Sequence, residues 1–446
     1  MMTLTPDTQL TDNHGFTKKQ KNELFSKINW RLMPLLFICY IIAYIDRINV
    51  GFAKLQLREV LGVDDRIFGS IYGIGAGLFF IGYFIFEVPS NLVLHRVGAR
   101  IWIARIMIVW GCVTILTMFI SSTFTFYLIR FLLGAAEAGF FPGVIFYLTF
   151  WYPEKERART IALFSTGGVI AGIIGSPLSG TILDLHGKMG LDGWQWLFLL
   201  EGIPAVLMGI IILIMLPNGP GNAKWLGDNE KMWIHKRLKE EAELVKDETH
   251  FKLKGVLSSS RVWLLCLIYF LMTFGAYGFE MWLPSIITDF SGMSYTLVGF
   301  INAIPYVGAV ILMLIIGTHS DKTGERRWHV ATAALIAAVG FAFSTYFRNP
   351  FLSVAALTMA FAGLKSTMGP FWVLGTTFLS GSAAAGGIAL INSVGNLGGF
   401  FGPTLVGIIR DRTGSTNIAF WIFGASLLLM AILVLTVKEN KKKLQS

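Results

Sequence analysis

Charge is scarce in this chain of 446 residues. Asp, Glu, Lys and Arg together make up only 14% of it, against about 25% in typical soluble proteins. With glycine counted and tyrosine left out, apolar residues reach roughly 62%, against about 45–50% in a soluble protein. A soluble chain this apolar lacks the polar side chains to cover its surface, and a disordered chain is far less hydrophobic. The composition therefore predicts a membrane protein.

Cysteine and the common catalytic signatures are also scarce or missing. The three cysteines, Cys39, Cys112 and Cys266, lie inside apolar runs, so we expect small core residues and not disulfides or metal ligands. The sequence has no G-x-x-x-x-G-K-[ST], no H-E-x-x-H and no G-x-S-x-G. These absences disfavour an ATP-driven pump and a membrane enzyme. We expect no cofactor and no metal, with the proton as the coupling ion.

Long apolar runs are what the sequence does have. Six of them precede a polar stretch and six follow it, and each is long enough to cross about 30 Å of hydrocarbon. The sequence predicts an all-α membrane protein with twelve transmembrane helices in two six-helix bundles. We divide it into a tail (1–30), a first bundle (31–216), a linker (217–260), a second bundle (261–437) and a second tail (438–446). The linker is expected to form surface helices near residues 228–248.

The basic residues predict the orientation. Lys and Arg number 26 in the tails and loops on the side of the N-terminus, and 7 in the loops on the other side. Cytoplasmic loops are enriched in Lys and Arg, so both termini are expected in the cytoplasm, with no signal peptide. The net charge of +10 is therefore explained without a nucleic-acid partner. The expected location is a bacterial inner membrane.

Two motifs recur at one spacing. The loop after the second apolar run and the loop after the eighth are similar, and they place Arg96 and Lys322 226 residues apart. Gly-Pro runs place Pro177 and Pro403 at the same spacing. Two unrelated motifs with one offset indicate duplicated halves with a central site between them. Alternating glycines at 73–77 indicate close helix packing.

A few charged residues lie inside the predicted spans, where an isolated charge is costly. Asp46 and Arg47 are neighbours, about 100° apart around a helix, so they face different surroundings. Arg130 and Glu137 are seven apart and share one helix face, separated by roughly 10 Å along the axis. This pattern favours a proton-coupled anion carrier, because Arg binds carboxylates with a fixed fork of donors and a buried acid responds to nearby charge. The alternative is two ion pairs that only lock helices together.

Three further polar residues are candidates for substrate contact in the second half. Lys365 lies in the middle of the tenth apolar run and suits a second carboxylate or a polar far end of the substrate. Its alternatives are a snorkelling side chain or an ion pair with Glu280. Asn392 and Asn396 share one helix face and suit hydroxyl groups, with interhelical hydrogen bonding as the alternative.

The loop motif from Gly317 to Arg326, G-x-x-x-D-K-x-G-x-R, resembles the signature of the major facilitator superfamily. The segments around Asp46 and around Glu137 resemble the anion:cation symporter family within it, in the branch of tartrate, sugar-acid, phthalate and hydroxyphenylacetate transporters. The resemblance implies proton-titrating roles for Asp46 and Glu137, a carboxylate-binding role for Arg47 and a coupling role for Arg130. It also implies site-lining hydroxyls, from Tyr44 and Tyr83.

The two similar loops have a mechanical interpretation. Their charged residues are expected to bond to helix ends on the cytoplasmic face and to hold one state closed; they are Arg96, Arg100, Asp321, Lys322 and Arg326. Together these features predict a monomeric symporter that imports a small organic acid anion with protons, by alternating access across the bilayer. The main alternative is a uniporter or exchanger of the same fold without proton coupling.

Overall fold

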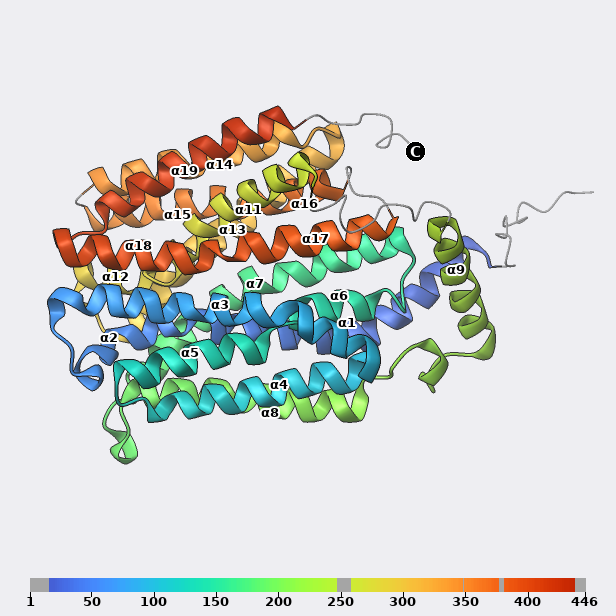
Figure 1. Cartoon of the computed structure of the whole chain (residues 1–446), viewed down its shortest axis with the longest axis horizontal. Coiled ribbons are helices and arrows are strands. Elements are labelled where there is room, and N and C mark those ends of the chain that lie inside the picture. The colour runs from blue at the N-terminus through green and yellow to red at the C-terminus, as the bar shows by residue number, and fades with distance from the viewer. Residues whose placement is uncertain (1–15, 247–257, 348, 377–380, 438–446) are drawn as a thin grey trace, which may run out of the picture.

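The computed structural model describes residues 16–246, 258–347, 349–376 and 381–437, which are almost entirely helical, with no strand among them. The long helices run side by side along one direction (Figure 1). Residues 1–15 and 438–446 of the two predicted tails, and residues 247–257 of the linker, lie outside the described part.

The N-terminal half contains six spans. They are α1 with α2 (Lys18–Ile48 and Val50–Leu61), α3 (Asp65–Val97), α4 (Ala99–Leu116), α5 with α6 (Thr123–Glu137 and Phe140–Leu148), α7 (Glu154–Leu183) and α8 (Gly193–Met215). The linker forms α9 (Asp228–Lys246), which confirms the expected surface helix. Lys27 of α1 donates to Glu230 of α9 at 2.8 Å and ties this helix to the bundle.

The C-terminal half repeats the arrangement. Its spans are α11 with α12 (Ser260–Glu280 and Leu283–Ser291), α13 (Tyr295–Thr323), α14 (Arg327–Tyr346), α15 with α16 (Pro350–Ser366 and Met368–Thr376), α17 with α18 (Gly381–Asn396 and Gly398–Thr413) and α19 (Asn417–Thr436). Within the described residues, eleven spans are long and apolar enough to cross a membrane. The predicted span near 384–409, α17 with α18, is not among these eleven, because glycine and asparagine dilute its apolar residues. Its packing against α3 and α11 shields it from lipid.

Large apolar side chains cover the outside of the bundle. Phe351 is 86% exposed and Ile214 is 74% exposed, and similar residues recur along most spans. Soluble monomers rarely expose contiguous apolar surface on this scale. The exposed belt therefore fits a hydrocarbon environment, as the composition predicts.

We name the two ends of the bundle after the helices that lie there. The α9 end holds α9, the start of α1 and the last turn of α19, whereas the α2 end holds α2 and the first turns of α3 and α13 (Figure 1). In Figure 1 the N-terminal half, blue to green, lies below the C-terminal half, yellow to red. The halves meet where α3 packs on α18 and where α7 packs on α13.

These two contacts are copies of one another. A Cβ on Gly73 of α3 would lie 2.4 Å from the carbonyl oxygen of Pro403, and a Cβ on Gly299 of α13 would lie 2.4 Å from that of Ser176. Residues 73 and 299 are 226 apart, the same spacing as Pro177 and Pro403. The duplication expected from the sequence is thus present in the packing, and the glycines at 73–77 serve close helix contact.

The α3–α18 contact predicts a selective effect of small substitutions. A Cβ on Gly407 would lie 2.0 Å from the carbonyl oxygen of Gly69, whereas one on Gly317 meets nothing within 4 Å. We expect Gly407→Ala to destabilise the protein by about 1–3 kcal/mol through overpacking, and Gly317→Ala to leave it unchanged or more stable. Thermal unfolding of the two purified variants checks this, and equal melting temperatures would contradict the close contact.

Candidate functional site

Four charged residues lie at interruptions of the spans. Arg47 precedes the junction of α1 and α2, Glu137 ends α5, Glu280 ends α11, and Lys365 is the penultimate residue of α15. A helix C-terminus carries a partial negative charge that favours cations and opposes carboxylates. The two basic residues are therefore well placed, and the two acids at these ends require a cation or a proton nearby.

The first acid is paired within the N-terminal half. Arg47 donates through Nη2 to Oε1 of Glu137, which is fully buried. The guanidinium also lies 5.4 Å from the ring of Phe79 and 5.6 Å from that of Tyr83. Its Nη1 donates to the hydroxyl of Tyr277 at 3.2 Å, across the interface between the halves. Oε2 of Glu137 has no hydrogen-bond partner among the described residues.

The second acid is paired within the C-terminal half. Nζ of Lys365 lies 3.0 Å from Oε1 of Glu280 and donates to the hydroxyl of Tyr44 at 2.8 Å. Tyr44 in turn donates to Oε1 of Glu280 at 2.7 Å. Lys365 therefore forms the ion pair with Glu280 and does not snorkel to an end of the span, while its contact with the substrate stays a prediction.

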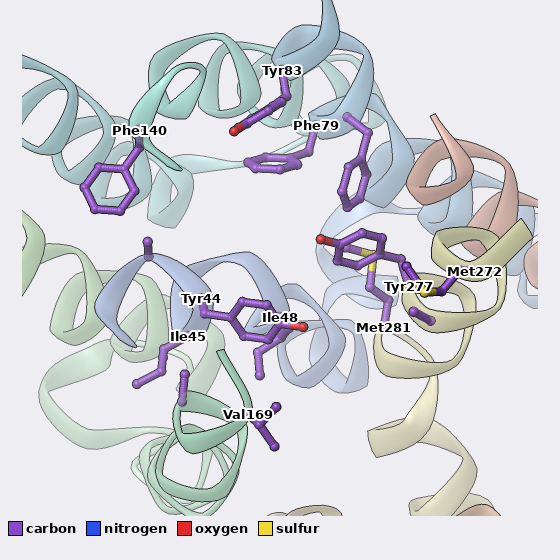
Figure 2. Close-up of a cluster of buried hydrophobic side chains, with 14 of the residues drawn as sticks. Tyr44, Ile45, Ile48, Phe79, Tyr83, Phe140, Val169, Met272, Tyr277 and Met281 are labelled. Atoms are coloured by element: carbon purple, nitrogen blue, oxygen red, sulfur yellow. The ribbon is translucent and has the colours of Figure 1, made fainter. Parts of the chain in front are cut away.

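Each ion pair is contacted by the hydroxyl of a tyrosine from the opposite half. Tyr44 and Arg47 are three apart on α1, and they contact Glu280 and Tyr277, which are three apart on α11. Residues three apart lie on one helix face, so the two helices face each other through both contacts. Figure 2 shows Tyr44 and Tyr277 with their hydroxyls turned toward the region between α1 and α11, which Tyr83 faces from α3.

Asp46 faces away from this centre. Its carboxylate accepts hydrogen bonds from Trp110 and from Thr114 (2.7 Å), both on α4, and from Asn49 at 3.0 Å. No ion pair joins it to Arg130 among the described residues. Arg130 is fully buried, donates to the carbonyl of Ala76 at 3.3 Å, and lies near enough to Asp46 for electrostatic interaction. The expected pairing of spans 1 and 4 therefore forms through Arg47 and Glu137.

The amides on α17 serve the interface between the halves. Asn392 donates to Oε1 of Glu87 on α3 at 2.8 Å, and Ser393 donates to Oε2 at 2.6 Å. Asn392 thus makes the interhelical hydrogen bond that was the alternative to substrate contact, whereas Asn396 is buried nearby on the same helix. Glu87 was not among the expected site residues. The sequence feature that could have marked it is its position between Tyr83 and Pro89 on a helical face.

The charged loops at the α9 end bond within themselves. Arg326 donates to Asp321 at 2.7 Å and to the hydroxyl of Ser320 at 2.8 Å. The side chains of Lys322 and Arg96 are exposed, and that of Arg100 is partly buried. The role expected of these loops, holding one state closed, stays a prediction.

Cross-half bonds lie instead at the α2 end. Asp411 at the end of α18 accepts from the backbone N–H groups of Gly69 (2.8 Å) and Ser70 (2.6 Å) at the start of α3. Asp184, after α7, accepts from the N–H (2.9 Å) and hydroxyl (2.6 Å) of Thr296 at the start of α13. We call these two contacts the carboxylate latch. Each carboxylate bonds to the first two turns of a helix in the opposite half, and we expect the latch to hold the α2 end closed.

A buried lysine reinforces the same end. Lys54 of α2 donates to Ser285 of α12 at 2.8 Å, and its Nζ lies 3.9 Å from the ring centre of Trp282. The residues of the latch were missed in the sequence, although Ser70 and Thr296 are spaced like the other duplicated positions. Short polar residues at span ends have many structural roles, so the spacing alone did not mark them.

Two duplicated six-span halves around a charged centre define a membrane transport protein. The Major Facilitator Superfamily model matches residues 36–403. A "Putative tartrate transporter" of Agrobacterium vitis is 46% identical over 96% of this chain and 94% of its own length. The "Putative metabolite transport protein NicT" of Pseudomonas putida is 46% identical over 97% and 98%. The chain belongs to the major facilitator superfamily and is a transporter, not an enzyme.

The fold agrees with solved structures of that superfamily. A "D-xylose-proton symporter" superposes with a TM-score of 0.74 at 13% identity, covering 93% of this chain and 98% of the other. This likeness shows the arrangement of the twelve spans. The charged centre of the present chain is described by its own contacts.

The carboxylate latch predicts a shift in conformation when it is removed. We expect Asp184→Ala with Asp411→Ala to open the α2 end, because each change deletes hydrogen bonds to a helix N-terminus worth about 1 kcal/mol or more. Electron spin resonance between labels at Arg66 and Arg412, in a background without the three native cysteines, should show a longer distance. Asp65→Ala is the matched control, since Asp65 pairs with Arg58 within one half. An unchanged distribution in the double variant would rule the latch out.

Proposed function

We propose that this protein is a proton-coupled symporter that imports a small organic acid anion by alternating access. The observation that carries the proposal is the Arg47–Glu137 pair. An arginine held by a fully buried carboxylate is a binding site for a second carboxylate, provided that the first is neutralised. Protonation of Glu137 releases Arg47 for the substrate, and deprotonation expels the substrate. Binding of the anion and of the proton are linked in this way.

The substrate class follows from the geometry and from the relatives. The guanidinium of Arg47 suits a carboxylate through bidentate donation, and the hydroxyls of Tyr277, Tyr44 and Tyr83 suit a hydroxylated or aromatic acid. The similarity to proteins named as tartrate transporters supports an organic acid of the tartrate, sugar-acid or aromatic carboxylate class. It also supports placement in the anion:cation symporter branch.

Asp46 is the second proposed proton site. It is a buried carboxylate on the same helix as Arg47, and its hydrogen bonds to Trp110 and Thr114 fix α1 against α4. A proton on Asp46 weakens these bonds, because a neutral carboxyl is a poorer acceptor than a carboxylate. Arg130, near both acids, is the proposed coupling residue.

The α9 end and both termini are proposed to lie in the cytoplasm of a bacterium. The excess of Lys and Arg in the loops at this end supports the assignment. The α2 end then faces outward and is closed by the carboxylate latch, so the structure is an inward-facing or occluded state. The loops with Asp321 and Arg96 are proposed to close the cytoplasmic side in the alternate state, as a monomer rocks between the two.

A uniporter or exchanger of the same fold is the alternative. The two functions differ in whether a proton gradient drives accumulation. In proteoliposomes with an inward proton gradient, the symporter accumulates labelled tartrate above its external concentration, whereas the uniporter only equilibrates it. Absence of accumulation for tartrate, gluconate and benzoate alike would overturn proton symport.

Substitutions at the first pair test the residue roles. We expect Glu137→Gln to bind substrate with a weaker pH dependence and to lose gradient-driven uptake by at least 10-fold, because Gln neither competes for Arg47 nor carries a proton. Asp46→Asn should also lose gradient-driven uptake. Arg47→Lys should weaken binding about 10-fold, since an ammonium lacks the planar fork. Uptake and binding isotherms measure these effects.

Conservative substitution of Asp64, the N-cap of α3, provides a control. Asp64→Asn retains a capping acceptor and lies outside the centre, so it should keep normal coupling. Full gradient-driven uptake in both Glu137→Gln and Asp46→Asn would refute their assignment as proton sites.

A further inference from the structure

The second ion pair has no task in the mechanism proposed for Arg47 and Glu137. Lys365 and Glu280 are almost completely buried, with side-chain exposures of 7% and 0%. A buried ion pair is seldom stabilising relative to apolar residues, because desolvation offsets the attraction. The presence of this pair at the centre of the molecule therefore indicates a role beyond packing.

The second pair repeats the construction of the first. Each consists of a base and an acid from interrupted helices of one half, and each receives a tyrosine hydroxyl from the other half. In each acid Oε1 contacts the basic residue. The other oxygen, Oε2, has no hydrogen-bond partner among the described residues. If the first pair binds a substrate carboxylate in place of its own glutamate, the second pair can bind one in the same way.

The two pairs are also close together. Tyr44 and Arg47 on α1, like Tyr277 and Glu280 on α11, are three residues apart, and Cβ atoms at this spacing are roughly 5–6 Å apart. One helical turn thus separates the contacts of the two pairs on both helices. A separation of this order suits an acid with two carboxylates on a short carbon chain.

We propose that Lys365, with Tyr44 and Glu280, is a second carboxylate subsite and that the transported acid is a compact dianion. One carboxylate of the substrate replaces Glu137 at Arg47, and the other replaces Glu280 at Lys365. Each displaced glutamate accepts one proton from water on the side from which the substrate enters. This inference rests on the proposed function and specifies its substrate class and its proton number.

The charge balance gives the proton number. A dianion brings two negative charges to a centre that is neutral as two ion pairs, and two protons restore neutrality. The other titratable groups that face Glu280 are the hydroxyls of Tyr44, Tyr277 and Tyr306, with Lys365 as the cation. None of the hydroxyls ionises near neutral pH, and Asp46 is bonded to α4 away from both pairs, so the two glutamates are the acceptors when the substrate binds. Binding of a monoanion should take up one proton only.

The test compares two acids that differ in one group. L-Tartrate and L-threonate have the same four-carbon chain, and threonate carries a hydroxymethyl group in place of one carboxylate. Phthalate and benzoate form a second such pair. Titration calorimetry of the purified full-length protein, in buffers of different ionisation enthalpy, gives both affinity and protons taken up. We expect at least one diacid to bind 10-fold or more tightly than its partner, with uptake of two protons.

The variants assign the difference to this subsite. Lys365→Gln with Glu280→Gln removes both charges and keeps the shapes, so the double variant should fold. It is expected to bind tartrate no more tightly than threonate, because the second carboxylate finds no cation, and to take up one proton with threonate. Glu280→Gln alone should retain the diacid preference and also take up one proton. Lys188→Gln, which removes an exposed lysine in the loop between α7 and α8, is the control and should keep the preference and both protons.

Each outcome bears on one proposal or on both. If the double variant keeps the diacid preference, or loses affinity for the diacid and the monoacid equally, the Lys365–Glu280 pair only holds helices together and the subsite is refuted. If wild-type protein binds each monoacid as tightly as its diacid, the subsite is refuted while carboxylate transport through Arg47 stands. Failure of all four acids to bind would overturn both.

Discussion

The cost of an unpaired charge in hydrocarbon governs the centre of this protein. Removing one partner of a buried ion pair costs about 3–5 kcal/mol, so Arg47 and Lys365 each require an anion in every state. In the structure Glu137 and Glu280 are those anions. They lie at helix C-termini, where the backbone opposes a carboxylate, and in the mechanism that we propose they leave when a substrate anion arrives and a proton is available.

The interruptions of the spans make this arrangement possible. A continuous helix satisfies its own backbone and directs side chains regularly outward, whereas an interrupted one leaves end groups whose dipole acts on the neighbouring charges. Gly139 adopts a left-handed conformation with φ 89° directly after α5 ends, two residues beyond Glu137. The other three interruptions are milder kinks, at Asn49, at Met281 and at Thr367. All four point the charged residues toward one region.

Much of the architecture could be predicted from the sequence, but the partners of the central charges could not. Hydropathy and the spacing of 226 residues predicted twelve spans in two copies, because a membrane span and a duplication are both one-dimensional patterns. The orientation of Asp46 relative to Arg47 depends on the rotation of α1 in the bundle, which periodicity does not specify. Asp46 therefore turned to α4, and Glu280, considered only as a possible partner of Lys365, proved central.

The distribution of contacts between and within the halves explains how such a centre can move. Each ion pair lies within one half, Arg47 with Glu137 and Lys365 with Glu280, whereas at this centre the contacts that cross the interface are hydrogen bonds of the hydroxyls of Tyr44 and Tyr277. A hydrogen bond to a charged group contributes about 1.5–3 kcal/mol, less than the cost of removing one partner of a buried ion pair. Rocking of the halves thus breaks the weak contacts and preserves the strong ones. The same division lets a substrate that replaces the acids bind across the interface and be carried through the change of state.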